Sequence, residues 1–301
     1  MKNVSLGHRT IADIDGQVDK VLRGLGNPEP PIDLRVVRDL LKLDRGYYST
    51  TDDSLLRETF SRMKVAGLQV LLRPTLLRDA VQNLSLKALY LPDQKRILLD
   101  QDLPVLKHRW NEAHEITHDV LPWHDGIAHG DPETTLSPAC HEQVESEANY
   151  GAGRLLFLGT SFEEVLRSSP CEFKLVETLH GQYGNTLTTT LWRVVELSLD
   201  PCVGLVTCHP RKATGVDVDD VKYFIRSPAF ANEFGAVTAA SLFTAVKGRC
   251  FGRRGPIGDG EFPLGNSRGE SVDFCFETFF NGHDALTLVR RKPIRKPILT
   301  R

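Results

Sequence analysis

The sequence predicts an α+β protein built from two domains. Three observations support this: helical apolar spacing through most of residues 1–199, a pair of strand-like runs within that region, and short apolar runs separated by loops from residue 200 onward. A chain of 301 residues is long enough for two domains, each with a core of its own. We therefore expect residues 1–199 and residues 200–301 to fold as separate domains.

The composition is that of a globular protein, with 41% hydrophobic and 25% charged residues. No stretch approaches the roughly 20 apolar residues of a membrane span, and the N-terminal residues lack the apolar core of a secretory signal. We expect a cytoplasmic protein without a membrane partner. A formal net charge of -2 argues against a general attraction to nucleic acid, so no direct nucleic-acid partner is expected.

The first part of the chain contains two helical patterns and a hairpin pattern. Residues 11–25 and residues 33–43 carry apolar side chains at helical spacing. Within the less regular residues that follow, Gln69–Arg73 is typical of a strand. The apolar runs Leu86–Leu91 and Arg96–Asp100, joined by a short turn, predict a β-hairpin whose edge could pair with an extended peptide.

A helix predicted from Leu103 to Leu121 carries the pattern H-E-x-x-H at residues 114–118, and Pro122 ends it. His114 and His118 lie four residues apart, so both imidazoles leave one face of the helix and can close on one metal ion. Glu115 would lie beside that ion. The alternative is a surface helix with two solvated histidines, but the apolar residues between and after the histidines predict a buried face.

A second helix, predicted from Glu142 to Leu158, offers a third ligand. Glu145 lies near its start, and Asn149 follows one turn later as a candidate partner for a metal-ligating side chain. Small residues at positions 148, 151 and 152 would let this helix approach another closely. Solvated helix carboxylates are the alternative interpretation, as for most glutamates.

The rest of the chain divides at Asp200-Pro201. Residues 161–199 predict two or three short helices, and residues 174–197 resemble a helix-turn-helix in outline. Beyond the boundary, four strands and one helix predict an antiparallel sheet with a helix; the strands are 203–207, 221–225, 272–279 and 285–290, and the helix is 229–246. Residues 248–269 are rich in Gly and Arg but lack the spacing of a phosphate-binding loop.

Two histidines and one carboxylate would supply three ligands of a zinc ion and leave the fourth position for water. Glu115 would then act as general base, taking a proton from water and returning it to a departing amine. Cys140 is a possible rival ligand, and the loop histidines at 124, 129 and 141 are expected to be surface or structural residues. The sequence does not choose an oxyanion-stabilising group among five candidates: His124, His141, Tyr150, Tyr183 and His209.

The segment His114–His118, followed by Glu145–Leu156, resembles the ImmA/IrrE metallopeptidases, whose second motif runs roughly E-x-E-A-N-x-F-A-x-x-L-L-M-P. The preceding hairpin is also similar, and the resemblance covers about residues 31–200. This sequence departs from the family pattern at Gly151, where the family has Phe, and at Phe157-Leu158, where it has Met-Pro. Both departures concern packing positions.

The resemblance implies a zincin-like fold in which His114, His118 and Glu145 hold zinc and Glu115 is catalytic. It implies an endopeptidase that cleaves a helix-turn-helix transcriptional repressor and so derepresses stress-response or mobile-element genes. By position, residues 200–301 would correspond to a GAF-like sensor domain. Two other hypotheses stay open: a regulatory module that binds a peptide without hydrolysing it, and a DNA-binding protein that uses residues 174–197.

Overall fold

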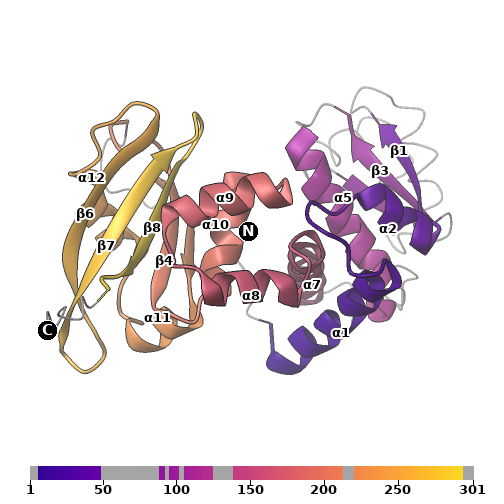
Figure 1. The fold of residues 1–301 in the computed structure, drawn as a ribbon, viewed down its shortest axis with the longest axis horizontal. Helices are drawn as coiled ribbons and strands as arrows, with labels where there is room; N and C mark the ends of the chain where they lie inside the picture. The colour runs from indigo at the N-terminus through magenta and orange to yellow at the C-terminus, as the bar shows by residue number, and fades with distance from the viewer. Residues whose placement is uncertain are drawn as a thin grey trace, which may run out of the picture. The chain divides into compact units, whose positions relative to one another are not determined.

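The computed structural model describes residues 6–48, 88–91, 95–101, 105–124, 138–212 and 220–293. The chain forms two compact units, Met1–Ser161 with Tyr183–Asn185, and Phe162–Gln182 with Thr186–Arg301 (Figure 1). Each unit combines helices with a β-sheet. The α+β prediction is therefore confirmed in its general form.

Two helices open the first unit, close to the predicted positions. Helix α1 spans His8–Gly24 and buries Ile14, Val18 and Val21 at helical spacing. Helix α2 spans Leu34–Leu41, and the side chain of Asp33 caps it by accepting the backbone N–H of Arg35.

Among the described residues of the first unit, three strands form a sheet in the order β1-β3-β2. The predicted hairpin is confirmed as β2 (Ala88–Leu91) and β3 (Arg96–Asp100), which pair antiparallel. Strand β1 (Asp44–Tyr48) pairs parallel with β3 and was not predicted, because its sequence DRGYY lacks an apolar alternation. The strand predicted at Gln69–Arg73 lies outside the described residues.

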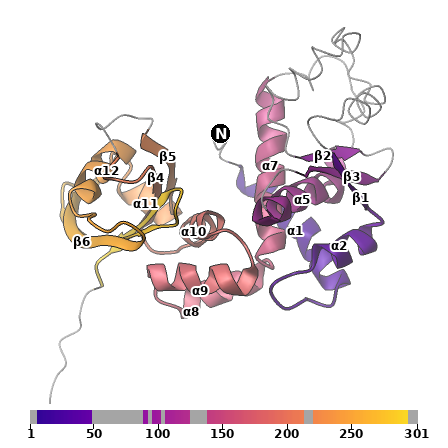
Figure 2. The same ribbon diagram turned by 90° about the horizontal axis from the view of Figure 1, so that it is seen from above.

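Helices α5 (Val105–Val120) and α7 (Pro138–Leu156) pack against each other in the first unit, and Figure 2 shows them crossing beside the three-stranded sheet. The small residues of α7 allow this approach. A Cβ atom added to Gly151 would lie 2.4 Å from Cγ2 of Thr117 on α5 and 3.3 Å from Cγ2 of Ile14 on α1. Glycine at this position therefore lets α7 touch both neighbouring helices.

A buried ion-pair network joins α5 to two other elements of the first unit. Glu112 of α5 is 4% exposed. Its carboxylate lies 2.6 Å from Nε of Arg38 on α2 and 3.1 Å from Nη1 of Arg45 on β1. The network fixes the helix that carries H-E-x-x-H against both the sheet and α2.

The second unit begins with most of α8 (Thr160–Ser168), followed by α9 (Phe173–Tyr183) and α10 (Leu187–Glu196). The predicted domain boundary places these helices with residues 1–199, whereas the two units divide near residue 161. The physical reason is that α10 packs on the second sheet: a Cβ atom on Gly204 would lie 3.4 Å from side-chain atoms of both Leu191 and Val195.

The second sheet is antiparallel, with strand order β5-β4-β8-β7-β6. The strands are β4 (Cys202–Thr207), β5 (Val221–Arg226), β6 (Gly255–Gly265), β7 (Ser271–Phe280) and β8 (Ala285–Arg291). Strand β4 is buried throughout because helices cover both of its faces. Val203 and Leu205 belong to the same hydrophobic core as residues of the two helices that follow β5, while Gly204 faces α10. Figure 1 shows helices on both sides of this sheet.

Two parts of the second unit differ from the prediction. The helix expected over 229–246 is two helices, α11 (Pro228–Glu233) and α12 (Ala239–Lys247), and Thr238 begins the second with a capping box to Ser241. Strand β6 falls in the Gly-rich and Arg-rich region in which no strand was predicted. It lies at the edge of the sheet, where prolines such as Pro256 and Pro263 are tolerated.

None of the helices in the described part of the chain is long and apolar enough to cross a membrane.

Candidate metal centre

His114 and His118 lie one turn apart on the same face of α5. Their Nε2 atoms are 3.3 Å apart, and their ring centroids are separated by 4.9 Å. The opposite side of the helix is anchored in the core by Ala113 and Ile116, which are fully buried. The helix therefore holds both imidazoles toward one point.

Glu145 of α7 completes the group. One carboxylate oxygen lies 3.2 Å from Nε2 of His114, and the other lies 3.8 Å from Nε2 of His118. Ligand atoms arranged tetrahedrally around one zinc ion are about 3.4 Å from one another, so these three side chains fit such an ion. The side chain of Glu145 is 36% exposed, which leaves an approach from solvent.

Glu115 is buried next to the two histidines. Burial raises its pKa to about 7, although the charge of His114 and a hydrogen bond from the backbone N–H of Tyr90 act in the opposite direction. A carboxyl group that titrates near neutrality is suited to taking up and releasing a proton.

Asn149 lies within hydrogen-bonding distance of one candidate ligand, as its Oδ1 is 3.2 Å from Nδ1 of His114. This is the geometry by which an amide oxygen holds the second nitrogen of a metal-ligating imidazole. Burial lowers the pKa of His114, but the hydrogen bond with Glu145 and the charges of Glu115 and Glu145 outweigh burial, so the pKa is raised.

His124 lies beside His118, the other candidate histidine ligand. Its Nδ1 lies 3.0 Å from Nδ1 of His118, and its Nε2 lies 3.0 Å from Oε2 of Glu147. Burial lowers the pKa of His124, and the hydrogen bond with Glu147 offsets this only in part. His124 is predicted to be a surface or structural residue, and in the structure it is buried within the first unit.

Glu147 is 4% exposed and receives three hydrogen bonds. Nε1 of Trp123 donates at 2.7 Å, Nε2 of His124 lies at 3.0 Å, and Nε2 of Gln143 donates at 2.9 Å. Burial alone would raise the pKa of Glu147, but these hydrogen bonds outweigh it and lower the pKa, so the carboxylate is ionised. The sequence signal for this residue is the second Glu of E-x-E, which we did not assign a role.

The hairpin is attached to α5 near the site. Asp119 of α5 accepts hydrogen bonds from the hydroxyl of Tyr90 on β2 and from Nζ of Lys95 in the hairpin turn, the latter at 2.5 Å. Together with the backbone bond from Tyr90 to Glu115, these contacts hold strand β2 beside the buried carboxyl group.

The remaining candidates do not join this cluster in the described structure. The hydroxyl of Tyr150 donates to Asp15 of α1 at 3.0 Å, the ring of Tyr183 packs against that of Phe157 in a tilted arrangement, and His209 belongs to the second unit. His129 lies outside the described residues, as do the side chains of Cys140 and His141. An oxyanion-stabilising residue is therefore still unassigned.

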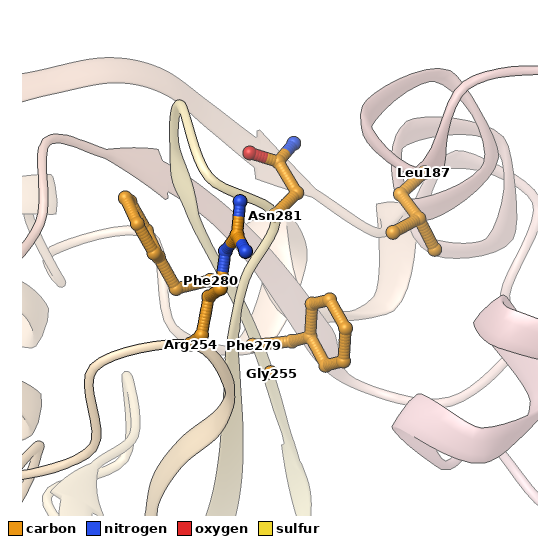
Figure 3. Close-up of a pocket in the computed structure, with 6 residues that line it drawn as sticks. All are labelled: Leu187, Arg254, Gly255, Phe279, Phe280 and Asn281. Atoms are coloured by element: carbon orange, nitrogen blue, oxygen red, sulfur yellow. The ribbon is translucent and has the colours of Figure 1, made fainter.

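The second unit has a surface hollow of about 390 Å³ that contains none of the predicted site residues. Figure 3 shows its lining, which comes from α10, the start of β6 and the end of β7; the residues are Leu187, Arg254, Gly255, Phe279, Phe280 and Asn281. It offers one guanidinium and one amide but no histidine or carboxylate, so its chemistry differs from that of the metal centre.

Comparisons with known proteins give a fold but no family. No protein-family model matches the chain, and no curated protein matches it. A solved structure described as a Mycobacterium tuberculosis transcriptional regulator is similar, with a TM-score of 0.53 and 13% sequence identity, over 93% of this chain and 87% of that chain. At this identity the similarity concerns the fold alone.

Proposed function

We propose that the first unit is a zincin-like, zinc-dependent endopeptidase. The observation that carries this proposal is the convergence of His114, His118 and Glu145, from two helices, next to the buried carboxyl group of Glu115. Three protein ligands with a solvent approach are characteristic of catalytic rather than structural zinc sites.

Each residue has a defined part in the proposed reaction. His114, His118 and Glu145 would hold the ion, which when bound supplies Lewis acidity that polarises a peptide carbonyl and eases the deprotonation of water. Glu115 accepts the proton of the attacking water and delivers it to the departing amine, so one group serves as base and then as acid. Asn149 orients His114 through its Nδ1 atom.

The proposed substrate is a helix-turn-helix transcriptional repressor, as the resemblance to ImmA/IrrE peptidases implies. Strand β2 supports a peptide substrate, because it is an edge strand among the described strands of its sheet and its Tyr90 contacts Glu115. An extended peptide paired with this edge would place its backbone beside the base. Cleavage would derepress stress-response or mobile-element genes in the cytoplasm, and the second unit would be a GAF-like sensor.

The test is Glu115→Gln in the full-length protein loaded with zinc. We expect the wild-type protein to cut a helix-turn-helix repressor encoded beside its gene at one position, measured by mass spectrometry of the products. Glu115→Gln should bind one zinc ion and leave the repressor intact, because the amide cannot accept the proton. Glu142→Gln, which alters an exposed carboxylate on α7, is the control and should cleave normally. Full cleavage by Glu115→Gln would refute the mechanism.

A non-hydrolytic regulatory or peptide-binding module is the competing proposal, favoured by the fold shared with a protein described as a transcriptional regulator. It predicts stoichiometric zinc binding and a repressor that is bound but never cut. The DNA-binding alternative has less support, because the one cation of α10, Arg193, is 4% exposed and lies 2.7 Å from Glu196. A steep dependence of DNA affinity on salt concentration would support DNA binding.

A further inference from the structure

We propose that His124 and Glu147 are positioning residues for the metal ligand His118, and that together they fix the tautomer and the orientation of its imidazole. The inference rests on the metal centre that the proposed function requires, but it does not depend on peptide hydrolysis. Neither residue belongs to the predicted ligand set of His114, His118 and Glu145.

The two ring nitrogens of His118 face different partners. Its Nε2 points to Nε2 of His114 and to the carboxylate of Glu145, so Nε2 is the metal-binding atom and must carry no proton. A neutral imidazole has one N–H, which must then be on Nδ1. At 3.0 Å from that nitrogen lies Nδ1 of His124, which accepts the hydrogen bond only if it is itself unprotonated.

The same reasoning extends to the next residue. With Nδ1 of His124 as acceptor, its single N–H is on Nε2, which lies 3.0 Å from Oε2 of Glu147. That oxygen belongs to an acceptor-only carboxylate, so every proton in the series has one position. The chain of hydrogen bonds from His118 to Glu147 therefore excludes the His118 tautomer that would block metal binding.

The far end of this chain is rigid. Both oxygens of Glu147 are used, since Oε2 also accepts from Trp123 and Oε1 accepts from Gln143. His124 and Glu147 are each 4% exposed, so water cannot readily replace a lost partner. The orientation of His118 is thus set by contacts from both α7 and the residues that directly follow α5.

His114 provides a comparison within the same site. Its Nδ1 faces Oδ1 of Asn149, a neutral amide oxygen, on the helix that also carries Glu145. The two histidine ligands are therefore held by different means, one by an amide and one by an imidazole tied to a carboxylate. A carboxylate behind an imidazole also raises its basicity as a ligand.

The test measures zinc affinity by competition with a chromogenic chelator, at a temperature where every apo protein is folded. Glu147→Gln and His124→Phe should each weaken zinc binding by about 10–100-fold, the usual effect of losing such a partner. Glu112→Gln is the matched control, because Glu112 is equally buried and lies on α5 but is paired with Arg38 and Arg45. It should lower the melting temperature and leave zinc affinity unchanged.

A conservative variant separates positioning from packing. His124→Asn places an amide oxygen close to where Nδ1 stands, so it should retain most of the zinc affinity that His124→Phe loses. The absorption spectrum of the Co²⁺-loaded protein should follow the same order, with a wild-type-like spectrum for His124→Asn and an altered one for His124→Phe.

Two results would overturn the proposal. One is unchanged zinc affinity in both His124→Phe and Glu147→Gln; the other is a loss in Glu112→Gln as large as theirs, which would indicate a general effect of destabilisation. Neither result depends on cleavage. A wild-type protein that binds zinc and cuts no repressor would refute the proposed peptidase while leaving these affinity differences intact.

Discussion

The carboxylate of Glu145 on α7 lies 3.2 Å from Nε2 of His114 on α5, so the candidate metal centre exists only where these two helices cross. Helix α5 contributes two candidate ligands and α7 contributes one, and the contact between the helices sets the distances among them. The packing of α5 against α7 is therefore as necessary to the site as the ligands. Variants of the ligands test metal binding, and variants of the packing residues test stability.

Removing the third ligand should reduce metal binding sharply. Glu145→Gln replaces a charged oxygen donor by a neutral amide that binds zinc poorly, so we expect zinc affinity to fall by at least about tenfold. Isothermal titration calorimetry of the metal-free protein measures this. Glu142→Gln, on the same helix but exposed, should bind zinc as the wild type does. Equal affinities in all three proteins would exclude Glu145 as a ligand.

Asn149 should matter less than a ligand but more than a surface residue. Asn149→Ala removes the oxygen that faces Nδ1 of His114, and we expect zinc affinity to fall by about 10-fold. Asn149→Asp keeps an oxygen at that place and should lose less. The opposite ranking of the two variants would argue that Asn149 acts only through helix packing.

The buried Glu112 should contribute strongly to stability. Glu112→Gln leaves the guanidinium of the buried Arg38 without its counter-charge, which should cost about 3 kcal/mol of unfolding free energy, measured by urea denaturation. Asp44→Asn breaks an exposed pair with Arg96 and should cost less than about 1 kcal/mol. Similar losses of unfolding free energy in the two variants would contradict the expectation that the buried ion pair contributes more to stability than the exposed one.

The contact at Gly151 gives a prediction about packing. Gly151→Ala would place a methyl group 2.4 Å from Thr117, so α5 and α7 must separate, and we expect a loss of about 1–3 kcal/mol. Gly16→Ala in α1 meets no atom within 4 Å and should instead add up to about 1 kcal/mol through helix propensity. Thermal unfolding of both variants checks the sign. Stabilisation by Gly151→Ala would show that the two helices are not in close contact.

Much of the local structure was predictable because it depends on short-range patterns. The hairpin of β2 and β3, the helix that carries His114 and His118, and the helix that carries Glu145 each follow from periodicity within a few residues. Strand β6 was missed for the same reason, since its glycines and prolines give no strand pattern and an edge position tolerates them.

The sequence by itself determined which side chains could bind a metal, because the spacing of His114 and His118 on one helix requires only local geometry. Only the tertiary structure decided the surroundings of those side chains. The approach of Glu145, the burial of Glu115, and the hydrogen bonds from His118 through His124 to Glu147 all join different elements. Such contacts depend on how the helices pack at Gly151 and on the path of the chain from Leu121 to His124, which no local periodicity specifies.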